Sequence, residues 1–361
     1  MVLLFNNFQI KEFRVNIPNP IPFFKKRESL RTSNYHLNSL TKNKGQRVYL
    51  QIINSITFMK FFQFKIALFF SLCFFSNANA QIQALFNSKT QLRDLTERWE
   101  LDTTSTRGTF LVTPYKPMYV LPVRWTSNPN EKPISGNLDP DYVAPPGVNY
   151  NNIESKFQLS FKTKVMQGIF WGYGDLWVAY TQISHWQIYN NALSRPFREV
   201  NYEPELILNV PIKFNFLGFK TRMVGVAFNH QSNGKSEPFS RSWNRVIFHA
   251  GLERKNWTIY VRPWLRVPGG KDDNPDIAEF VGRGDVNVIY TKNGNIISFV
   301  GSHNLNFNSK ARGNSTFSWS YPIKDNLKGY LLISHGYGET LIDYNHLQTT
   351  VGLGVSLIEW L

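Results

Sequence analysis

The residues whose chemistry stands out lie in one short stretch, 229–245. His230 and Ser232 are two residues apart, so on an extended chain their side chains project from the same face. A serine hydroxyl beside an imidazole can attack an acyl carbonyl once the imidazole takes its proton, and Asn244 can hold that imidazole in the required tautomer. Gly234 allows the backbone to approach closely, so we expect Ser232 and Gly234 to line the position of the developing oxyanion.

The same stretch has a simpler interpretation as an ordinary hairpin tip. A histidine two residues before a serine occurs by chance in many proteins. An Asn-Gly pair followed by proline is common turn chemistry. The strands that flank the stretch must therefore decide between a catalytic and a structural interpretation.

Those strands are predicted by period-two alternation in segments of 8–12 residues, separated by clusters of Gly, Asn, Asp and Pro. Phe157, Leu159 and Phe161 alternate with polar residues, and similar patterns occur in 206–212, 222–230, 257–265 and 350–357. His230 and Ser232 share the parity of the apolar residues Val224, Val226 and Phe228.

Asn244 likewise shares the parity of apolar residues, those at 246, 248, 250 and 252. If 222–232 and 243–253 pair as an antiparallel hairpin, Asn244 lies beside His230 on the apolar face. Polar groups on a lipid-facing surface carry an energetic cost and have little structural purpose. They make sense where the substrate is the lipid itself.

The N-terminal part of the chain resembles a secretory leader. Met59 and Lys60 open a short basic region, an apolar run follows, and Ala78 and Ala80 supply small residues before a cleavage point. We expect residues 59–80 to be a signal peptide, cut after Ala80. We expect residues 1–58 to be an over-extended start, with translation beginning at Met59.

The global charge is misleading until this leader is removed. Of the 40 basic residues 11 precede residue 81, as do 2 of the 25 acidic ones, so residues 81–361 carry a net charge of +6. A nucleic-acid-binding function loses its support, because most of the excess charge is not on the predicted folded part. The single cysteine, Cys73, lies in the leader, so the mature chain has no disulfide and no thiolate chemistry.

Three features favour an all-β fold, an antiparallel 12-stranded transmembrane β-barrel, over a soluble secreted β-sandwich, which also alternates. The leader exports the chain, Trp and Tyr recur at strand ends, and only a closed barrel satisfies every strand's backbone groups in lipid. Residues 81–361 would form the barrel, with 81–107 as a short periplasmic segment, a short helix at 90–99 and a long loop at 127–152. The predicted lumen is filled by side chains that include Lys162, Arg222, Arg245 and Arg262.

Several widely spaced motifs resemble the outer-membrane phospholipase A (phospholipase A1) family. They are the 229–245 stretch together with Tyr180-Thr181-Gln182, Pro196-Phe197-Arg198-Glu199, Asn201-Tyr202-Glu203-Pro204, Asp272-Asp273-Asn274-Pro275-Asp276, Gly336-Tyr337-Gly338-Glu339 and Leu341-Ile342-Asp343-Tyr344-Asn345. The resemblance implies a twelve-stranded barrel in the bacterial outer membrane. It implies hydrolysis of acyl esters of phospholipids and lysophospholipids, with Ser232 as nucleophile, His230 as base and Asn244 as orienter.

The same resemblance implies a Ca²⁺ site shared by two subunits of an active homodimer. The matching positions are Ser194 of one subunit with the backbone carbonyl of Lys235 and with Ser240 of the other, and Asp273 as a further ligand in the following loop. Glu237 stands where the family has aspartate. Oxygen ligands of this kind suit calcium.

Gln182 matches the family's interface glutamine, and its parity places it on the apolar face. A second copy across a two-fold axis could supply a hydrogen-bonding partner for its amide. The competing function is a non-catalytic outer-membrane barrel, a porin or an adhesion scaffold, in which 229–245 is only a turn.

Overall fold

The computed structural model of the chain describes residues 94–143, 146–270, 272–324 and 327–358. The expected over-extended start (1–58) and signal peptide (59–80) lie outside these residues, so both stay predictions. The elements are α2 (Leu95–Trp99), β1 (Val112–Pro114), β2 (Met118–Thr126), the 3₁₀-helix η1 (Pro140–Tyr142), β3 (Ile153–Met166), β4 (Asp175–Trp186), β5 (Phe197–Phe216), β6 (Phe219–Ser232), β7 (Ser242–Arg254), β8 (Trp257–Val267), α3 (Ile277–Val281), β9 (Gly284–Lys292), β10 (Asn295–His303), β11 (Gly313–Lys324), β12 (Leu327–Gly336) and β13 (Gln348–Ile358).

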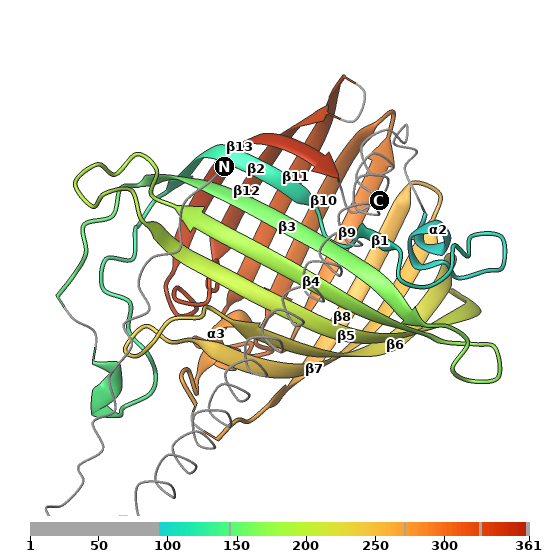
Figure 1. Cartoon of the computed structure of the whole chain (residues 1–361), viewed down its shortest axis with the longest axis horizontal. Helices are drawn as coiled ribbons and strands as arrows, with labels where there is room; N and C mark the ends of the chain where they lie inside the picture. The colour runs from blue at the N-terminus through green and yellow to red at the C-terminus, as the bar shows by residue number, and fades with distance from the viewer. Residues whose placement is uncertain (1–93, 144–145, 271, 325–326, 359–361) are drawn as a thin grey trace, which may run out of the picture. The chain divides into compact units, whose positions relative to one another are not determined.

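Strands β2 to β13 form a closed antiparallel barrel of twelve strands (Figure 1). Each strand pairs with its neighbours in the sequence, and β13 pairs with β2 through Val351 opposite Trp125, which closes the sheet. The short β1 pairs with β3 beyond the stretch of β3 that β2 covers, so it adds no thirteenth position. The predicted barrel is confirmed, and one closed sheet replaces the two packed sheets of a sandwich.

The two faces of the barrel wall differ as the alternation predicts. On β6, the outward Phe228 is 50% exposed, whereas the next residue, Asn229, is completely buried. On β3, Leu159 and Phe161 are exposed while Ser160 and Lys162 are buried. The apolar face therefore lies outside, where lipid would cover it, and the polar face lies inside.

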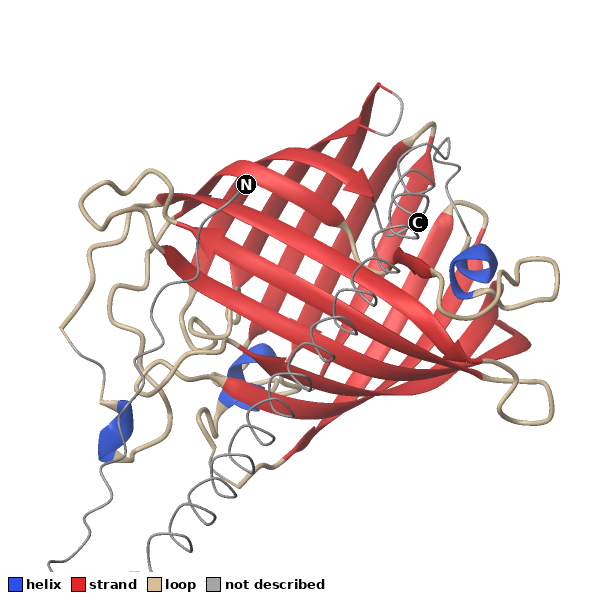
Figure 2. Ribbon diagram, in the orientation of Figure 1, coloured by secondary structure: helices blue, strands red, loops and turns tan. Residues whose placement is uncertain are grey.

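Connections at the two ends of the barrel differ in length. At one end, two-residue turns join β5 to β6, β7 to β8 and β9 to β10, and a longer turn joins β3 to β4. Asn293 and Gly294 both have positive φ, 50° and 78°, as a two-residue hairpin of the primed type requires. At the other end, longer segments follow β2, β4, β6, β8, β10 and β12 (Figure 2). The stretch 229–245 lies at this second end, among the long loops.

Side chains fill the part of the lumen that lies beside α2. At the end with short turns, α2 buries Leu95 and Trp99, and Lys162 Nζ lies 3.3 Å from the centroid of the Trp99 ring. The expected helix at 90–99 is thus present as Leu95–Trp99, capped by Asp94, whose side chain accepts from Glu97 N, and residues 90–93 lie outside the described part.

The four basic residues expected in the lumen differ in their burial and in their ion-pair partners. Lys162 and Arg245 are buried. Arg262 pairs with Asp285 at 2.5 Å. Arg222 lies at a register shift between Thr221 and Met223, keeps 32% of its side chain exposed, and pairs with Glu253 at 3.0 Å.

Within the described ranges, no helix is long and apolar enough to cross a bilayer.

Candidate active site

The predicted catalytic residues lie where β6 ends and β7 begins, on the outer face of the barrel. His230 is directly opposite Asn244 in the register, and Ser232 is opposite Ser242. His230, Ser232 and Asn244 are all half-buried, between the exposed apolar wall and the long loops. The structure thus brings together the two strands that the alternation predicted as a hairpin.

His230 and Asn244 are joined by a hydrogen bond of 2.8 Å between Nδ1 and Oδ1. Because an amide oxygen can only accept, Nδ1 must carry the imidazole proton in this arrangement, which leaves Nε2 with a free lone pair. Ser232 lies two residues along β6 on the same face, but no hydrogen bond between Ser232 and His230 is present among the described contacts. Attack by Ser232 would require its Oγ to come within about 3 Å of Nε2.

The loop that follows Ser232 is organised by Asn233, which the sequence interpretation did not single out. Its Oδ1 accepts from Arg241 N at 3.0 Å, and its Nδ2 donates to Phe239 O at 2.9 Å. Gly234 follows with φ of 65°, a left-handed conformation that glycine adopts without strain. The only signal for this scaffold was the Asn-Gly pair, which predicts a turn but not what it holds.

The four residues expected to ligate calcium are brought together only in part. Ser240 Oγ donates to Asp273 Oδ2 at 2.8 Å, so these two side chains meet. Lys235 belongs to the same loop; its expected ligand is the backbone carbonyl, and its side-chain Nζ pairs with Glu199, 3.0 Å away. Ser194, with φ of 58°, lies in the separate loop between β4 and β5, and none of its described contacts is to the other three.

The donor chemistry at this place fits a hard cation. Asp273 supplies a carboxylate, Ser240 a hydroxyl, and the neighbouring Ser242 also donates to Asp273 Oδ2, at 2.9 Å. These are oxygen donors, which Ca²⁺ prefers. No group of three or more His, Cys, Asp or Glu side chains gathers anywhere in the described ranges, so a site here would need hydroxyl and carbonyl oxygens as well.

Gln182 lies on the outer face at the same level as Ser232. The register places Gln182 opposite Tyr202 on β5, and Tyr202 opposite Ser232 on β6. Its Oε1 accepts from Tyr180 OH at 3.1 Å, and its Nε2 donates to Ser184 Oγ at 3.2 Å. The expected interface residue and the expected nucleophile therefore share one row of the barrel wall.

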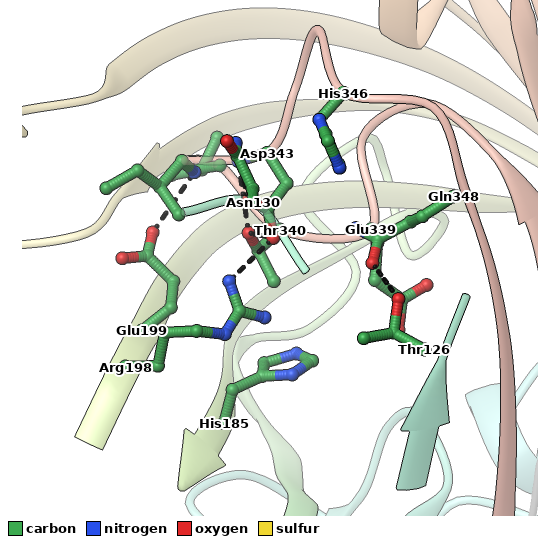
Figure 3. A network of polar contacts seen from close by, with 12 residues as sticks. Thr126, Asn130, His185, Arg198, Glu199, Glu339, Thr340, Asp343, His346 and Gln348 are labelled. Carbon is green, nitrogen blue, oxygen red and sulfur yellow. Dashed lines mark hydrogen bonds and ion pairs between the residues drawn. The ribbon is translucent and has the colours of Figure 1, made fainter. Parts of the chain in front are cut away.

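At the end of the barrel with the long loops, a polar network surrounds Arg198 and Asp343, and sequence reasoning missed it (Figure 3). Arg198 donates to both carboxylate oxygens of Glu154, at 2.9 and 3.0 Å, and to Asp343 Oδ2 at 2.7 Å. Asn130 donates to Asp343 Oδ1 at 3.0 Å, so the long loop after β2 joins the network. Burial alone would raise the pKa of the Asp343 carboxyl, but the Arg198 guanidinium and the hydrogen bonds that the carboxylate accepts lower that pKa.

Glu199 connects this network to the loop after Ser232. Its carboxylate pairs with Lys235 Nζ at 3.0 Å and accepts from Ile342 N at 3.2 Å. Lys235 Nζ also donates to Arg198 O at 2.6 Å. The backbone that carries Gly234 and Lys235 is thus fixed from inside the barrel, while His230 and Asn244 face outward.

Comparisons with known proteins all find similarity to phospholipases A1. A family model described as phospholipase A1 matches residues 95–357. A putative phospholipase A1 of Neisseria meningitidis is 41% identical over 265 residues, which cover 71% of this chain and 68% of that protein. Phospholipase A1 of Escherichia coli is 39% identical over 248 residues, 69% of this chain and 82% of that protein.

Solved structures extend the comparison to three dimensions. The outer membrane phospholipase A of Escherichia coli has a TM-score of 0.62 at 37% identity, covering 69% of this chain and 95% of that one. The Salmonella typhi outer membrane phospholipase, a dimer with bound calcium, has a TM-score of 0.63 at 37% identity, covering 71% of this chain and 95% of that one.

Proposed function

Because the chain belongs to the phospholipase A1 family, an outer-membrane family of ester hydrolases, we propose that it cleaves acyl esters of membrane lipids at the outer face of its barrel. Its substrates are phospholipids and lysophospholipids. The observation that carries the proposal is the His230–Asn244 hydrogen bond on a face otherwise covered by exposed apolar side chains. An oriented imidazole in that position has no evident structural use, but it is well placed to serve a lipid ester.

The proposed reaction follows from the three side chains. Ser232 Oγ bonds to the acyl carbonyl carbon while its proton passes to His230 Nε2, and Asn244 Oδ1 holds the imidazole by accepting from Nδ1. The backbone N–H groups of Ser232 and Gly234 face the developing oxyanion. The imidazolium then gives its proton to the departing glycerol oxygen, and a water molecule repeats the sequence to release the fatty acid.

Calcium is the proposed cofactor, as the Salmonella typhi relative suggests. Lys235 and Ser240 of one subunit, Asp273 beside them, and Ser194 of the other subunit would hold it through oxygen atoms. Bound calcium would supply positive charge that stabilises the oxyanion. The hydrogen bond between Ser240 and Asp273 supports this assignment, since it already brings two of the oxygen donors together.

A homodimer is the proposed active form. Ser194 is separate from Lys235, Ser240 and Asp273 within one chain, so a second copy would complete the set. Gln182 would meet its own copy across a two-fold axis, next to the row that carries Ser232. A resting monomer and an active dimer would protect the membrane from its own enzyme. Export by the expected signal peptide 59–80 would deliver the chain to the outer membrane.

The test is a fatty-acid release assay on the refolded protein in detergent, with calcium or with chelator, and with Ser232→Ala beside the wild type. We expect calcium-dependent release that Ser232→Ala abolishes. Equal rates with calcium and chelator would remove the metal from the proposal. Absence of release from wild type with calcium would favour the non-catalytic barrel, a porin or an adhesion scaffold.

A further inference from the structure

A segment of the first long loop, residues 135–142, packs on the turn that carries Asp273. Ser135 Oγ donates to Asp273 O at 2.5 Å, and Asn137 Nδ2 donates to Asp272 O at 2.8 Å. These two bonds join segments more than 130 residues apart in the sequence. The segment therefore fixes the backbone of the turn, whereas Ser240 of the loop after Ser232 contacts the Asp273 side chain.

One side chain of the segment reaches the carboxylate itself. Tyr142 is only 3% exposed, and its hydroxyl donates to Asp273 Oδ1 at 2.6 Å. The other oxygen, Oδ2, accepts from Ser240 at 2.8 Å and from Ser242 at 2.9 Å. The two oxygens are thus separated by role, since Tyr142 holds one and the serines of the active-site hairpin contact the other.

The local structure makes Tyr142 a rigid anchor. It ends η1, in which Asp139 caps the helix by accepting from Asp141 N at 3.1 Å and Pro140 occupies the first position. Because a carboxylate oxygen accepts hydrogen bonds, the Tyr142 hydroxyl is the donor in its bond to Asp273.

We propose that Tyr142 is a positioning residue that orients the Asp273 carboxylate for the cation. This rests on the proposed calcium site. A carboxylate free to rotate must be ordered when the cation binds, whereas one held through Oδ1 presents Oδ2 toward Ser240 without that cost. Partners that orient a metal ligand in this way typically change metal affinity by about 10-fold to 100-fold when removed.

A neighbouring tyrosine provides a matched control. Tyr344 is completely buried in the same group of loops, and its hydroxyl donates to Asp276 Oδ1 at 2.5 Å and accepts from Gly136 N at 2.7 Å. Tyr344→Phe removes a buried hydroxyl–carboxylate bond and loosens the same segment. It does so without touching Asp273.

The experiment compares wild type, Tyr142→Phe, Tyr344→Phe and Asp273→Asn as refolded full-length barrels in detergent. Calcium chloride is titrated calorimetrically, and unfolding and the rate at saturating calcium are measured beside it. We expect Tyr142→Phe to weaken calcium binding about 10-fold and to leave the rate at saturating calcium unchanged. Tyr344→Phe should lower the free energy of unfolding about as much as Tyr142→Phe does, but it should keep the wild-type calcium affinity.

The outcomes separate this inference from the proposal beneath it. If Asp273→Asn weakens calcium binding and Tyr142→Phe does not, the positioning role is wrong and the calcium site stands. Equal losses of affinity in both tyrosine variants would also overturn it, because that result indicates general loosening of the loops. If wild type binds no calcium, or Asp273→Asn binds as wild type does, the calcium site fails and the positioning role fails with it.

Discussion

Adjacent residues on β6 and β7 form two cross-strand pairs that point in opposite directions, and they are held very differently. Outside, His230 and Asn244 share one hydrogen bond of 2.8 Å and are half-buried. Inside, Arg245 donates twice to Asn229, at 2.7 and 3.0 Å, and pairs with Glu203 at 3.2 Å.

The inner pair is surrounded by further partners. Asn229 donates to Glu203 Oε1 at 2.9 Å, and the Arg245 guanidinium lies 4.2 Å from the centroid of the Trp243 ring. A buried charge with this many partners is costly to disrupt, since each remaining group would be left without compensation. The outer pair has one internal bond and keeps Nε2 free. Many contacts hold the inner pair in the barrel wall and few hold the outer pair, as expected if the outer pair has the proposed catalytic role.

The largest expected effect separates the two faces by activity alone. Ser232→Ala removes the proposed nucleophile from the outer face, and we expect hydrolysis to fall by about 10⁴-fold or more. The barrel should stay intact, because the Ser232 side chain makes no described hydrogen bond that the substitution would break. Fatty-acid release measures the first expectation. The heat-dependent shift of the folded barrel on electrophoresis shows whether the barrel stays intact. If the shift is lost, the substitution has disrupted the fold, and the outer face is not purely functional.

The inner pair should respond in the reverse way. Arg245→Met leaves Glu203 and Asn229 without their guanidinium partner, and we expect the free energy of unfolding to fall by about 3 kcal/mol or more. The protein that remains folded should hydrolyse lipid at close to the wild-type rate, since Arg245 does not face the substrate. Urea unfolding in a defined lipid, with activity normalised to folded protein, tests both statements. Unchanged stability would show that the inner network is dispensable.

The matched outer substitution is one residue away. Asn244→Ala removes the acceptor for His230 Nδ1, so the imidazole can rotate and change tautomer. We expect the rate to fall by about 100-fold, which is less than the loss of the nucleophile, because His230 can still accept a proton from Ser232. Unfolding should be unchanged. Wild-type activity in this variant would mean that the observed hydrogen bond does not serve the reaction.

The sequence predicts the pairing of β6 with β7 much better than the contacts that these and other strands make with distant parts of the chain. Alternation along 222–232 and 243–253 is a local pattern, and one assumption of pairing correctly places His230 opposite Asn244. The same pairing places Asn229 opposite Arg245, but other inner contacts join parts of the barrel that are far apart in the sequence. Arg198 meets Glu154 across 44 residues and Asp343 across 145. Such partners depend on the shear and tilt of the closed barrel, which local periodicity does not specify.

The contacts of the long loops are likewise not predicted by local sequence patterns. Residues 127–152 are polar and rich in proline, which predicts a loop but not that Tyr142 would reach Asp273 or Asn130 would reach Asp343. Arg222 illustrates a further difficulty, since a register shift beside it alters which groups it can meet. The motifs suggest which residues act, but the contacts that hold those residues come from long-range packing.

The smallest expected effect concerns the outer face away from the catalytic pair. Gln182 is already hydrogen-bonded to Tyr180 and Ser184 within its own chain, so a partner across the dimer axis would replace contacts rather than add new ones. Hydrogen bonds of this kind in membranes contribute on average only about 0.6 kcal/mol. We therefore expect Gln182→Ala to weaken calcium-dependent dimerisation by about threefold, measured by sedimentation equilibrium in detergent, and to leave monomer unfolding unchanged. A loss of a hundredfold or more would mean that Gln182 breaks its internal bonds on association and carries much of the interface. The contacts of Gln182 with a second subunit would then contribute as much free energy as the inner ion pairs contribute to folding.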